Sequence, residues 1–582
     1  MSEISDNLQP DLESIRQARE LSAKAALAQN TLTELTQNKI DLIVKSMAQA
    51  ATENAESLAK LAQNETGFGI VKDKIKKNIF ASEKVFNFIK PLKTVGVISE
   101  STEKSFLEIA EPFGPVAAVI PSTNPTSTTI YKILIALKAR CSIVISPHPT
   151  AIKCIVRTAE IMEEAACSAG APTGAINWMR TVTIEGTQAL MQHRNIAVIL
   201  ATGGMGLVRA AYSAGKPAYG VGPGNAPAYI ESSADIEKAV NDIITGKTFD
   251  NGVLCSSENS VVVDNRIFEK VMLAFEENGG HFLSSEESQK LSKILITSQR
   301  LPNPDLVGRS ASFIADRADI SIPQKTRVLI APLQGVGRDF PLSIEKLCPV
   351  LSFYTVKDWQ EGCERCKEIL QYGGMGHTMS IHSKNEDIIL EFGLKKPASR
   401  IVVNTPTTHG SIGLTTGLPP AMTLGCGGFG GNITSDNITP LHLLNIKRLA
   451  YEVKPVSDSR TIKTSTNSNQ QLALPSPPMH PVKPSMSSDL VSQRAEAFLK
   501  TRAASEDINT RSQKDSTTSV VNPQSDKTTE LPVPVEFVCE DDVRKAIAEH
   551  KRILIGKKTI VTPAARDLGN DNKIFIESEL NL

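Results

Sequence analysis

One cysteine stands where a thiol could react as a nucleophile. In FDNGVLCSSENS (249–260) a short apolar run ends at Cys255, and small and polar residues follow it. A thiolate at the start of such a loop, close to backbone N–H groups, is expected to have a lowered pKa and to attack a carbonyl carbon. The alternative is a small buried residue of the core, which is the commoner role of a free cysteine.

The oxyanion formed by such an attack needs hydrogen-bond donors that are already in place. A side-chain amide together with the backbone N–H of the cysteine would suffice. Asn124, in IPSTNPTST, can supply the amide. Because Pro121 and Pro125 restrict this turn, Asn124 could instead serve only as a turn residue.

A glycine-rich stretch indicates a site for a phosphate. ATGGMGLVRAA (201–211) follows an apolar strand and precedes a helical run, so backbone amides can approach a phosphate at a helix N-terminus. The residues of this turn are Thr202, Gly203, Gly204 and Gly206. A tight strand-to-helix connection is the alternative reading. Glu345, in EKLCPV, could accept hydrogen bonds from a ribose, or it could be a solvated surface charge.

Helical and strand-like segments alternate through the first 455 residues. Strands are predicted at 116–121, 142–146, 196–203 and 226–230, with helices such as 150–168 between them. This alternation favours an α/β fold with a parallel, doubly wound sheet. A chain of 582 residues is too long for one ordinary domain, so two large lobes are expected.

Composition narrows the classes of partner. The chain has 63 basic and 63 acidic residues and a formal net charge of +0, which predicts neither nucleic-acid nor membrane binding and favours small molecules. Nine cysteines without a disulfide pattern and a polar N-terminus predict a reducing, cytoplasmic location. Cys363 and Cys366 form a lone C-x-x-C without a second pair, so no metal site is expected.

The remainder of the chain differs in composition. Residues 456–531 are rich in Ser, Thr, Pro, Gln and Lys and are predicted to be a flexible linker. Within it, 489–505 has the apolar spacing of an amphipathic helix. Residues 532–582 are expected to form a small module, with strands at VEFV and RILIG around a helix at 540–549.

Taken in order, these segments resemble the aldehyde dehydrogenase superfamily, and specifically its CoA-acylating branch, which includes the N-terminal half of bifunctional aldehyde-alcohol dehydrogenases. The resemblance covers about residues 10–455 and is carried by ETGFG (65–69), PSTNPTST (121–128), SPHP (146–149), LATGGMGLVRAAYSAGKPAYGVGPGN (200–225), FDNGVLCSSENS (249–260), EKLCPVLSFY (345–354), GGMGHT (373–378), SRIVVNTP (399–406) and NITSDNITPLHLLNIKRLAY (432–451). It implies a Rossmann-type NAD-binding domain over 1–235, completed by 426–455, and an α/β catalytic domain over 236–425.

The resemblance also implies roles for single residues. Cys255 would be the nucleophile and Asn124 the oxyanion donor, while the 201–206 turn, Glu345 and His148 of SPHP would bind NAD. His377, in GGMGHT, could handle a proton, or it could be a histidine satisfied within a turn.

Two departures from the hydrolytic relatives point to CoA as the acyl acceptor. Those enzymes place a water-activating glutamate where this chain reads VGPGNA (221–226), and a lysine near the cofactor where it reads SPHP. Without that base, an acyl-enzyme should persist until the CoA thiol attacks it.

We therefore expect NAD-dependent oxidation of a short aldehyde, acetaldehyde first, to acyl-CoA. Propionaldehyde or sulfoacetaldehyde as substrate, a hydrolytic dehydrogenase, and an inactive docking relative are the alternatives. The C-terminal extension resembles those that direct acylating dehydrogenases into bacterial microcompartments. This resemblance predicts shell proteins as partners. The alternative is a transient helix within a linker. Because the family that this chain resembles commonly forms oligomers, a homo-oligomer is expected.

Overall fold

The computed structural model describes residues 2–101, 105–454, 535–538, 540–549, 551–561, 565–566, 568–569, 572 and 574–577. The chain divides into two compact units, Met1–Arg460 and Thr461–Leu582, and each is described by itself. The predicted linker (456–531) and its amphipathic helix (489–505) lie outside the described residues.

The first unit begins with a series of helices. They are α1 (Ser2–Thr33), α2 (Gln37–Glu53), α3 (Ala55–Thr66), α4 (Val71–Ile79), the π-helical turn η1 (Phe80–Lys84) and α5 (Val85–Ile89). In α2, Ile40, Ile43, Val44 and Met47 recur at helical spacing and are all buried, because this face packs on the core below it.

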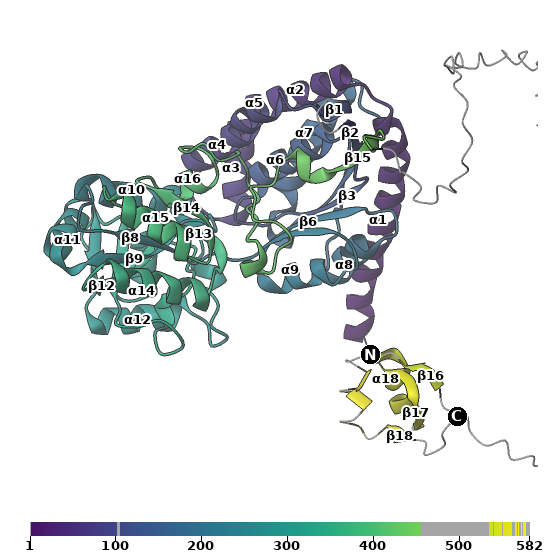
Figure 1. The fold of residues 1–582 in the computed structure, drawn as a ribbon. Coiled ribbons are helices and arrows are strands. Elements are labelled where there is room, and N and C mark those ends of the chain that lie inside the picture. The colour runs from purple at the N-terminus through teal and green to yellow at the C-terminus, as the bar shows by residue number, and fades with distance from the viewer. Residues whose placement is uncertain are drawn as a thin grey trace, which may run out of the picture. The chain divides into compact units, whose positions relative to one another are not determined.

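A five-stranded parallel sheet forms the centre of the first lobe. Its order is β5-β4-β3-β6-β7, with β3 (Val116–Val119), β4 (Ile143–Ser146), β5 (Ile176–Trp178), β6 (Val198–Thr202) and β7 (Ala218–Val221). Successive residues of β3 join different cores: Val116 and Ala118 pack with α2, α6 (Pro125–Lys138) and α7 (Ile152–Ser168), whereas Ala117 and Val119 pack with α1, α8 (Ile184–Gln192) and α9 (Met205–Tyr212). Helices thus cover both faces, and the predicted doubly wound sheet is confirmed (Figure 1).

A seven-stranded sheet forms the second lobe, and all its neighbouring strands are parallel. Its order is β10-β11-β12-β9-β8-β13-β14, with β8 (Ala226–Ile230), β9 (Glu258–Asp264), β10 (Gly280–Phe282), β11 (Val328–Pro332), β12 (Val350–Val356), β13 (Gly376–His382) and β14 (Ala398–Val403). One face packs on α10 (Ile236–Thr248) and α11 (Phe268–Glu277), and the other on α14 (Trp359–Tyr372) and α15 (Glu386–Lys395). The remaining helices of this lobe are α12 (Ser285–Leu295), α13 (Ala311–Arg317) and α16 (Thr407–Ser411).

The boundary between the lobes differs from the predicted one. Strand β8 was expected inside a first domain ending at residue 235, but it pairs with β9 and β13 of the second sheet. The chain crosses between the sheets at residues 222–225, directly after β7. An apolar run identifies a strand but not the sheet that it joins, so the sequence placed this boundary one strand too late.

A three-stranded antiparallel sheet brings the end of the first unit back to the first lobe. Its order is β1-β2-β15, with β1 (Gly96–Ser101), β2 (Phe106–Pro112) and β15 (Leu444–Ala450). Leu443 and Leu444 join the core that contains α6 and α7, and the Tyr219 hydroxyl donates to the His442 carbonyl oxygen over 2.8 Å. Short 3₁₀ turns complete this unit: η2 (Pro149–Ala151), η3 (Phe249–Gly252), η4 (Asn265–Ile267), η5 (Pro304–Leu306), η6 (Pro341–Ser343), η7 (Gly428–Gly430) and η8 (Pro440–Leu443).

The second unit contains a small parallel sheet, order β16-β17-β18, with β16 (Val535–Val538), β17 (Ile553–Val561) and β18 (Phe575–Glu577), and the helix α18 (Glu540–Ala548). Val538, Val543, Ala546, Ala565 and Ile574 form its buried core. The two predicted strands and the helix between them are confirmed.

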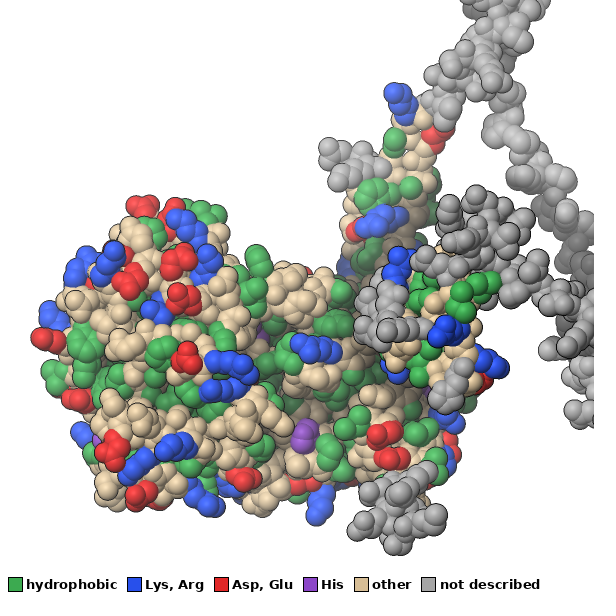
Figure 2. Space-filling model, turned by 90° about the horizontal axis from the view of Figure 1, so that it is seen from below, with side chains coloured by type: hydrophobic (Ala, Val, Ile, Leu, Met, Phe, Trp, Pro, Cys, Tyr) green, Lys and Arg blue, Asp and Glu red, His purple; other side chains and the backbone are tan. Residues whose placement is uncertain are grey.

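Charges of both signs are interspersed over the face seen in Figure 2, without a large region of one sign. Within the described part of the chain, no helix combines the length and the apolar character that crossing a membrane requires.

Candidate active site

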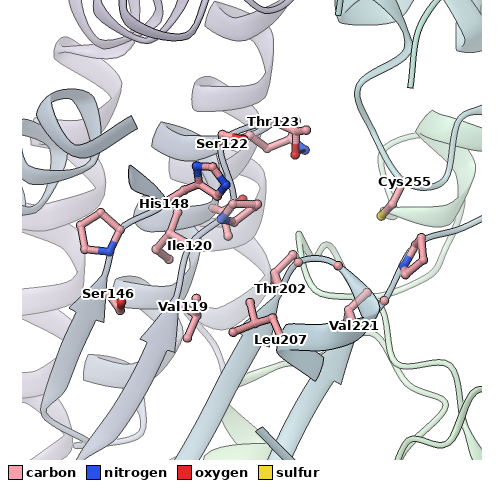
Figure 3. A pocket seen from close by; sticks show the side chains of 18 of the residues that line it. Val119, Ile120, Ser122, Thr123, Ser146, His148, Thr202, Leu207, Val221 and Cys255 are labelled. Carbon is pink, nitrogen blue, oxygen red and sulfur yellow. Dashed lines mark hydrogen bonds between the residues drawn. The ribbon is translucent and has the colours of Figure 1, made fainter. Parts of the chain in front are cut away.

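A cavity of about 600 Å³ lies at the carboxyl ends of the strands of the five-stranded sheet. Its wall contains residues that end or directly follow β3, β4, β6 and β7, namely 120–124, 146–149, 202–204, 206–207 and 221–223. Carboxyl ends of parallel strands open at the same edge of a sheet, and ligands of doubly wound folds bind there. Cys255 reaches the cavity from the second lobe, on the side opposite Ser146 and His148 (Figure 3).

The glycine-rich turn suits a dinucleotide. The first amides of α9, which begins at Met205, have no carbonyl of a preceding turn to bond and border this cavity. A Cβ on Gly204 or Gly206 would meet nothing within 4 Å, so the space beside these two residues is open. The Thr202 hydroxyl is buried and has no hydrogen-bond partner among the described residues, and it can bond a ligand.

His148 lies across the cavity from this turn. Its exposed ring caps η2, because Nδ1 accepts from the Thr150 N–H over 3.2 Å. The site therefore brings His148 together with Thr202, Gly203, Gly204 and Gly206, the five residues predicted for the cofactor from SPHP and the glycine turn.

The loop that carries Cys255 has an unusual backbone. Asp250 and Asn251, in η3, have φ values of 50° and 54°, in the left-handed region that residues other than glycine rarely adopt. Cys255 follows four residues after Asn251, and its thiol is partly exposed to the cavity. Cys255 therefore lies in the wall of the cavity, and its role as a nucleophile stays a prediction.

The expected pKa of Cys255 is also wrong in sign. Burial, followed by the nearby Glu345 carboxyl and Cys426, raises the pKa of the Cys255 thiol to about 12. Arg400 and the backbone N–H of Cys255 lower it, but by less than the other groups raise it. In the protein without ligands Cys255 is therefore a thiol near neutral pH, and only a small fraction is nucleophilic thiolate.

Asn124 lines the same cavity. It precedes Pro125, the first residue of α6, but its side chain makes no capping hydrogen bond with that helix. Instead Oδ1 accepts from Lys77 Nζ over 2.5 Å, and Nδ2 donates to the Thr123 hydroxyl over 3.2 Å. Asn124 is thus free of the purely structural capping role that its position would allow, and its amide is available at the cavity.

Glu345 is buried rather than solvated. Its Oε1 accepts the Gly224 N–H over 3.0 Å, and burial raises the pKa of its carboxyl to about 8. Glu345 lines the same cavity as Cys255 and raises the pKa of its thiol, so it does not lie on the open surface as a solvated charge.

His377 differs from the other predicted residues because it does not line the cavity. It is fully buried at the start of β13, and Gly224 separates it from the Cys255 carbonyl. Burial, with Arg400, lowers the pKa of His377 to about 3, so the ring is neutral. Its Nδ1 pairs with the Thr378 hydroxyl at 2.9 Å, and Nε2 has no partner within the described parts of the chain.

Sequence reasoning missed a cluster that surrounds Asn124 and the cysteine loop. Lys74 and Lys77 of α4 both contact the carboxylate of Asp250. The segment VKDKIKKNI reads as a solvated, charged helix, and no local signal distinguishes these two lysines from Lys72 or Lys76.

Cys363 and Cys366 are packing residues of α14, both buried. Within the ranges that the structure describes, no group of three or more His, Cys, Asp or Glu side chains is placed to hold a metal ion.

Comparisons with known proteins agree with this geometry. The family model described as the aldehyde dehydrogenase family matches residues 10–280. The chain is 42% identical over 428 residues to the bifunctional aldehyde-alcohol dehydrogenase of Escherichia coli K12, covering 73% of this chain and 48% of that protein. It is 39% identical over 433 residues to the succinate-semialdehyde dehydrogenase (acetylating) of Clostridium kluyveri, covering 74% and 95%. The chain thus spans about half the length of the bifunctional relatives that it matches.

Solved structures give the same result. An acetylating aldehyde dehydrogenase from Geobacillus thermoglucosidasius is 51% identical with a TM-score of 0.76, covering 77% of this chain and 99% of that one. A propionaldehyde dehydrogenase of the fucose-utilisation microcompartment of Clostridium phytofermentans is 28% identical with a TM-score of 0.68, covering 75% and 97%. This chain belongs to the aldehyde dehydrogenase family.

Proposed function

We propose that the chain is a CoA-acylating aldehyde dehydrogenase, which oxidises a short uncharged aldehyde with NAD and passes the acyl group to CoA. The observation that carries this proposal is that Cys255, Asn124 and the glycine turn of residues 202–206 line one cavity. A nucleophile, an oxyanion donor and a phosphate-binding turn are thereby within reach of one aldehyde and one dinucleotide.

The cavity wall lacks a base that could activate water, which supports CoA as the acyl acceptor. Gly222 and Pro223 line the cavity in the segment where hydrolytic relatives carry their glutamate, and neither can act as a base. Glu345 is the one carboxylate among the described lining residues, and it is occupied by the Gly224 N–H. A thioester on Cys255 is therefore expected to wait for a thiol rather than to hydrolyse.

The charge of the cavity favours an uncharged substrate. Among the described residues that line it, none is Lys or Arg. Succinate semialdehyde and sulfoacetaldehyde carry an anionic group, and a cavity wall without Lys or Arg would not offset the free-energy cost of desolvating it. Acetaldehyde and propionaldehyde carry no charge. The 2′-phosphate of NADP would lack a cation for the same reason, which supports NAD. Acetaldehyde is the substrate that we propose first.

The chain's own residues would act as follows. Deprotonated Cys255 adds to the aldehyde carbon, and the new oxyanion accepts hydrogen bonds from Asn124 Nδ2 and from the Cys255 N–H. Bound at residues 202–206, the nicotinamide dinucleotide supplies a hydride acceptor, so that the adduct becomes a thioester. The CoA thiol then attacks the thioester carbon, Cys255 leaves as thiolate, and acyl-CoA is released.

We retain His377 as the group that accepts the proton of the CoA thiol. Its Nε2 without a described partner supports this role, and because burial lowers the pKa of the ring to about 3, the role requires that the bound acceptor raise this pKa. Its burial behind Gly224 requires the acceptor step to open a path beside that residue.

The proposal is tested by following NADH formation from acetaldehyde with and without CoA. CoA-dependent turnover that Cys255→Ala abolishes supports it. CoA-independent formation of acetate would establish the hydrolytic alternative, and the absence of turnover the docking alternative. A panel with propionaldehyde, succinate semialdehyde and sulfoacetaldehyde checks the charge argument, which fails if an anionic aldehyde has the highest kcat/KM.

We further propose that the enzyme assembles as a homo-oligomer in a bacterial microcompartment, with the C-terminal extension contacting shell proteins. The likeness to a microcompartment propionaldehyde dehydrogenase and the division of the chain into two compact units support this. Truncation after residue 460 is expected to preserve kcat and to disperse the enzyme in cells. Unchanged co-purification of the truncated enzyme with shell proteins would contradict the role of the extension, and light scattering measures the oligomer.

A further inference from the structure

Two lysines are buried beside the candidate active site without taking part in the chemistry described above. Lys74 and Lys77 lie one turn apart on α4 and are 2% and 3% exposed. Both ammonium groups contact Oδ2 of Asp250, which is 0% exposed; the Lys74 distance is 3.0 Å. Buried charges persist when they are paired and hydrogen-bonded, so this cluster must be held together by its own contacts.

Asp250 ties α4 to the loop of the nucleophile. Its Oδ1 accepts the Ile70 N–H over 2.6 Å, and its own N–H donates to Asp73 Oδ2 over 3.0 Å. A Cβ on Gly69 would lie 1.9 Å from Oδ1, so the approach of the two segments depends on that glycine. The left-handed backbone of Asp250 is thus fixed by α4, and Cys255 follows five residues later.

Lys77 has a second contact, which Lys74 lacks among the contacts described. Its Nζ donates to Asn124 Oδ1 over 2.5 Å. An ammonium group has donors and no acceptor, so the end of the amide that faces Lys77 must be the oxygen. The Nδ2 end, with its two donors, is thereby directed to Thr123 and the cavity that Thr123 also lines.

We propose that Lys77 is a positioning residue for acyl-enzyme formation: anchored by Asp250, it fixes the Asn124 amide with Nδ2 available to the oxyanion. This inference rests on the proposed function. The same carboxylate accepts the Ile70 N–H, and the Asp250 N–H donates to Asp73, so Asp250 joins the cysteine loop to α4 through backbone contacts that do not involve Lys74. The positive charge beside Oδ1 also polarises the amide and strengthens the Nδ2 donors.

The orientation depends on the protonation of Lys77. Burial lowers the pKa of Lys77 to about 8, although Asp250 and Asp73 oppose this shift and Lys74 adds to it. Asp73 and Lys74 lie on α4 with Lys77, and Asp250 faces it from η3. A neutral amine has a lone pair and can accept from Nδ2, so the amide loses its fixed orientation above this pH.

The test compares Lys77→Met with Lys74→Met, a matched control that removes the other lysine from the same carboxylate. Loss of an oxyanion donor costs about 10²–10³ in kcat, which bounds the effect. We expect Lys77→Met to lower the single-turnover rate of acyl-enzyme formation by at least about tenfold, with KM for NAD unchanged. Lys74→Met should stay within about threefold of the parent while melting at a similarly reduced temperature.

A double-mutant cycle separates positioning from general damage. In an Asn124→Ala background the amide is absent, so Lys77→Met should cost almost nothing further. Above pH 8, loss of the Lys77 proton should offset the rising fraction of Cys255 thiolate, so the rate of the parent should level off there, and this levelling should be lost in the Asn124→Ala background. Equal losses in both backgrounds, or equal effects of the two lysine variants, would overturn the inference while leaving parent activity and the proposed function intact. A parent enzyme without CoA-dependent turnover would overturn both.

Discussion

The raised pKa of Cys255 makes the reactivity of the free enzyme steeply dependent on pH. With a pKa of about 12, the thiolate is about 10⁻⁴ of the thiol at pH 8, and this fraction rises tenfold for each pH unit. Alkylation of Cys255 by iodoacetamide should therefore accelerate by between about 100-fold and about 1000-fold from pH 7 to pH 10 without a plateau, because ionisation of Glu345 near pH 8 offsets up to about one pH unit of the rise. The rate is measured on the protein without ligands from the mass spectrum of the Cys255 peptide.

Glu345 gives this prediction a second, internal check. Its carboxylate is the second largest cause of the raised pKa of Cys255, after burial, and its own pKa is raised to about 8. Near pH 6.5 Glu345 is neutral, so Glu345→Gln should alkylate like the parent enzyme. Near pH 9.5 the parent carries the opposing charge, and the variant should react up to about tenfold faster, which corresponds to one pKa unit.

Glu258→Gln is the matched control, because Glu258 is also a buried carboxyl near Cys255 in sequence but does not line the cavity. Its alkylation profile should follow that of the parent enzyme. A plateau of the parent rate below pH 9, or an effect of Glu345→Gln that is the same at pH 6.5 and pH 9.5, would refute the electrostatic reasoning.

Three other changes have distinct expected outcomes. Gly206→Ala places a methyl group in the open space at the start of α9, so it should raise KM for NAD about tenfold. It should also increase thermal stability, because alanine is a better helix former than glycine by up to about 1 kcal/mol. A fall in both KM and melting temperature would contradict this. Burial raises the pKa of Glu258 to about 7. Protonation of Glu258 therefore stabilises the fold fully below pH 4.5, and this contribution is lost as pH rises through 7. Glu258→Gln should raise the melting temperature at pH 8 but not at pH 4.5, which differential scanning fluorimetry can measure. His377→Gln should slow transfer of the acyl group to CoA by about 10²-fold and leave the burst of NADH intact. Stopped-flow absorbance measures NADH formation and acyl transfer separately. A reduced NADH burst would contradict the proposed role.

Much of the site could be predicted from local patterns. The apolar runs of β3, β4 and β6 and the glycines after β6 are determined by residues close together in sequence, because strand periodicity and tight turns are local properties. The position of Cys255 beside those glycines was inferred only through the family resemblance. The structure brings them to one cavity because parallel strands end at the same edge.

Other features depended on residues far apart in the chain. The sheet that β8 joins is decided by its pairing with β9 and β13, and its apolar sequence would suit either sheet. The sign of the Cys255 pKa shift follows from burial and from Glu345, ninety residues later, which outweigh the local N–H groups considered at first. Desolvation is a property of the whole surroundings, and no short segment of sequence reports it.

The sequence by itself therefore determined which groups are available for chemistry: a thiol, an amide and a glycine-rich turn on a parallel α/β framework. Only the tertiary structure decided how they are held. Lys77 and Asp250, 173 residues apart, meet beside Asn124, and His377 is buried behind Gly224 rather than in the cavity. The physical reason is that periodicity acts over neighbouring residues, whereas ion pairing and burial are fixed by contacts that form only when distant segments pack together.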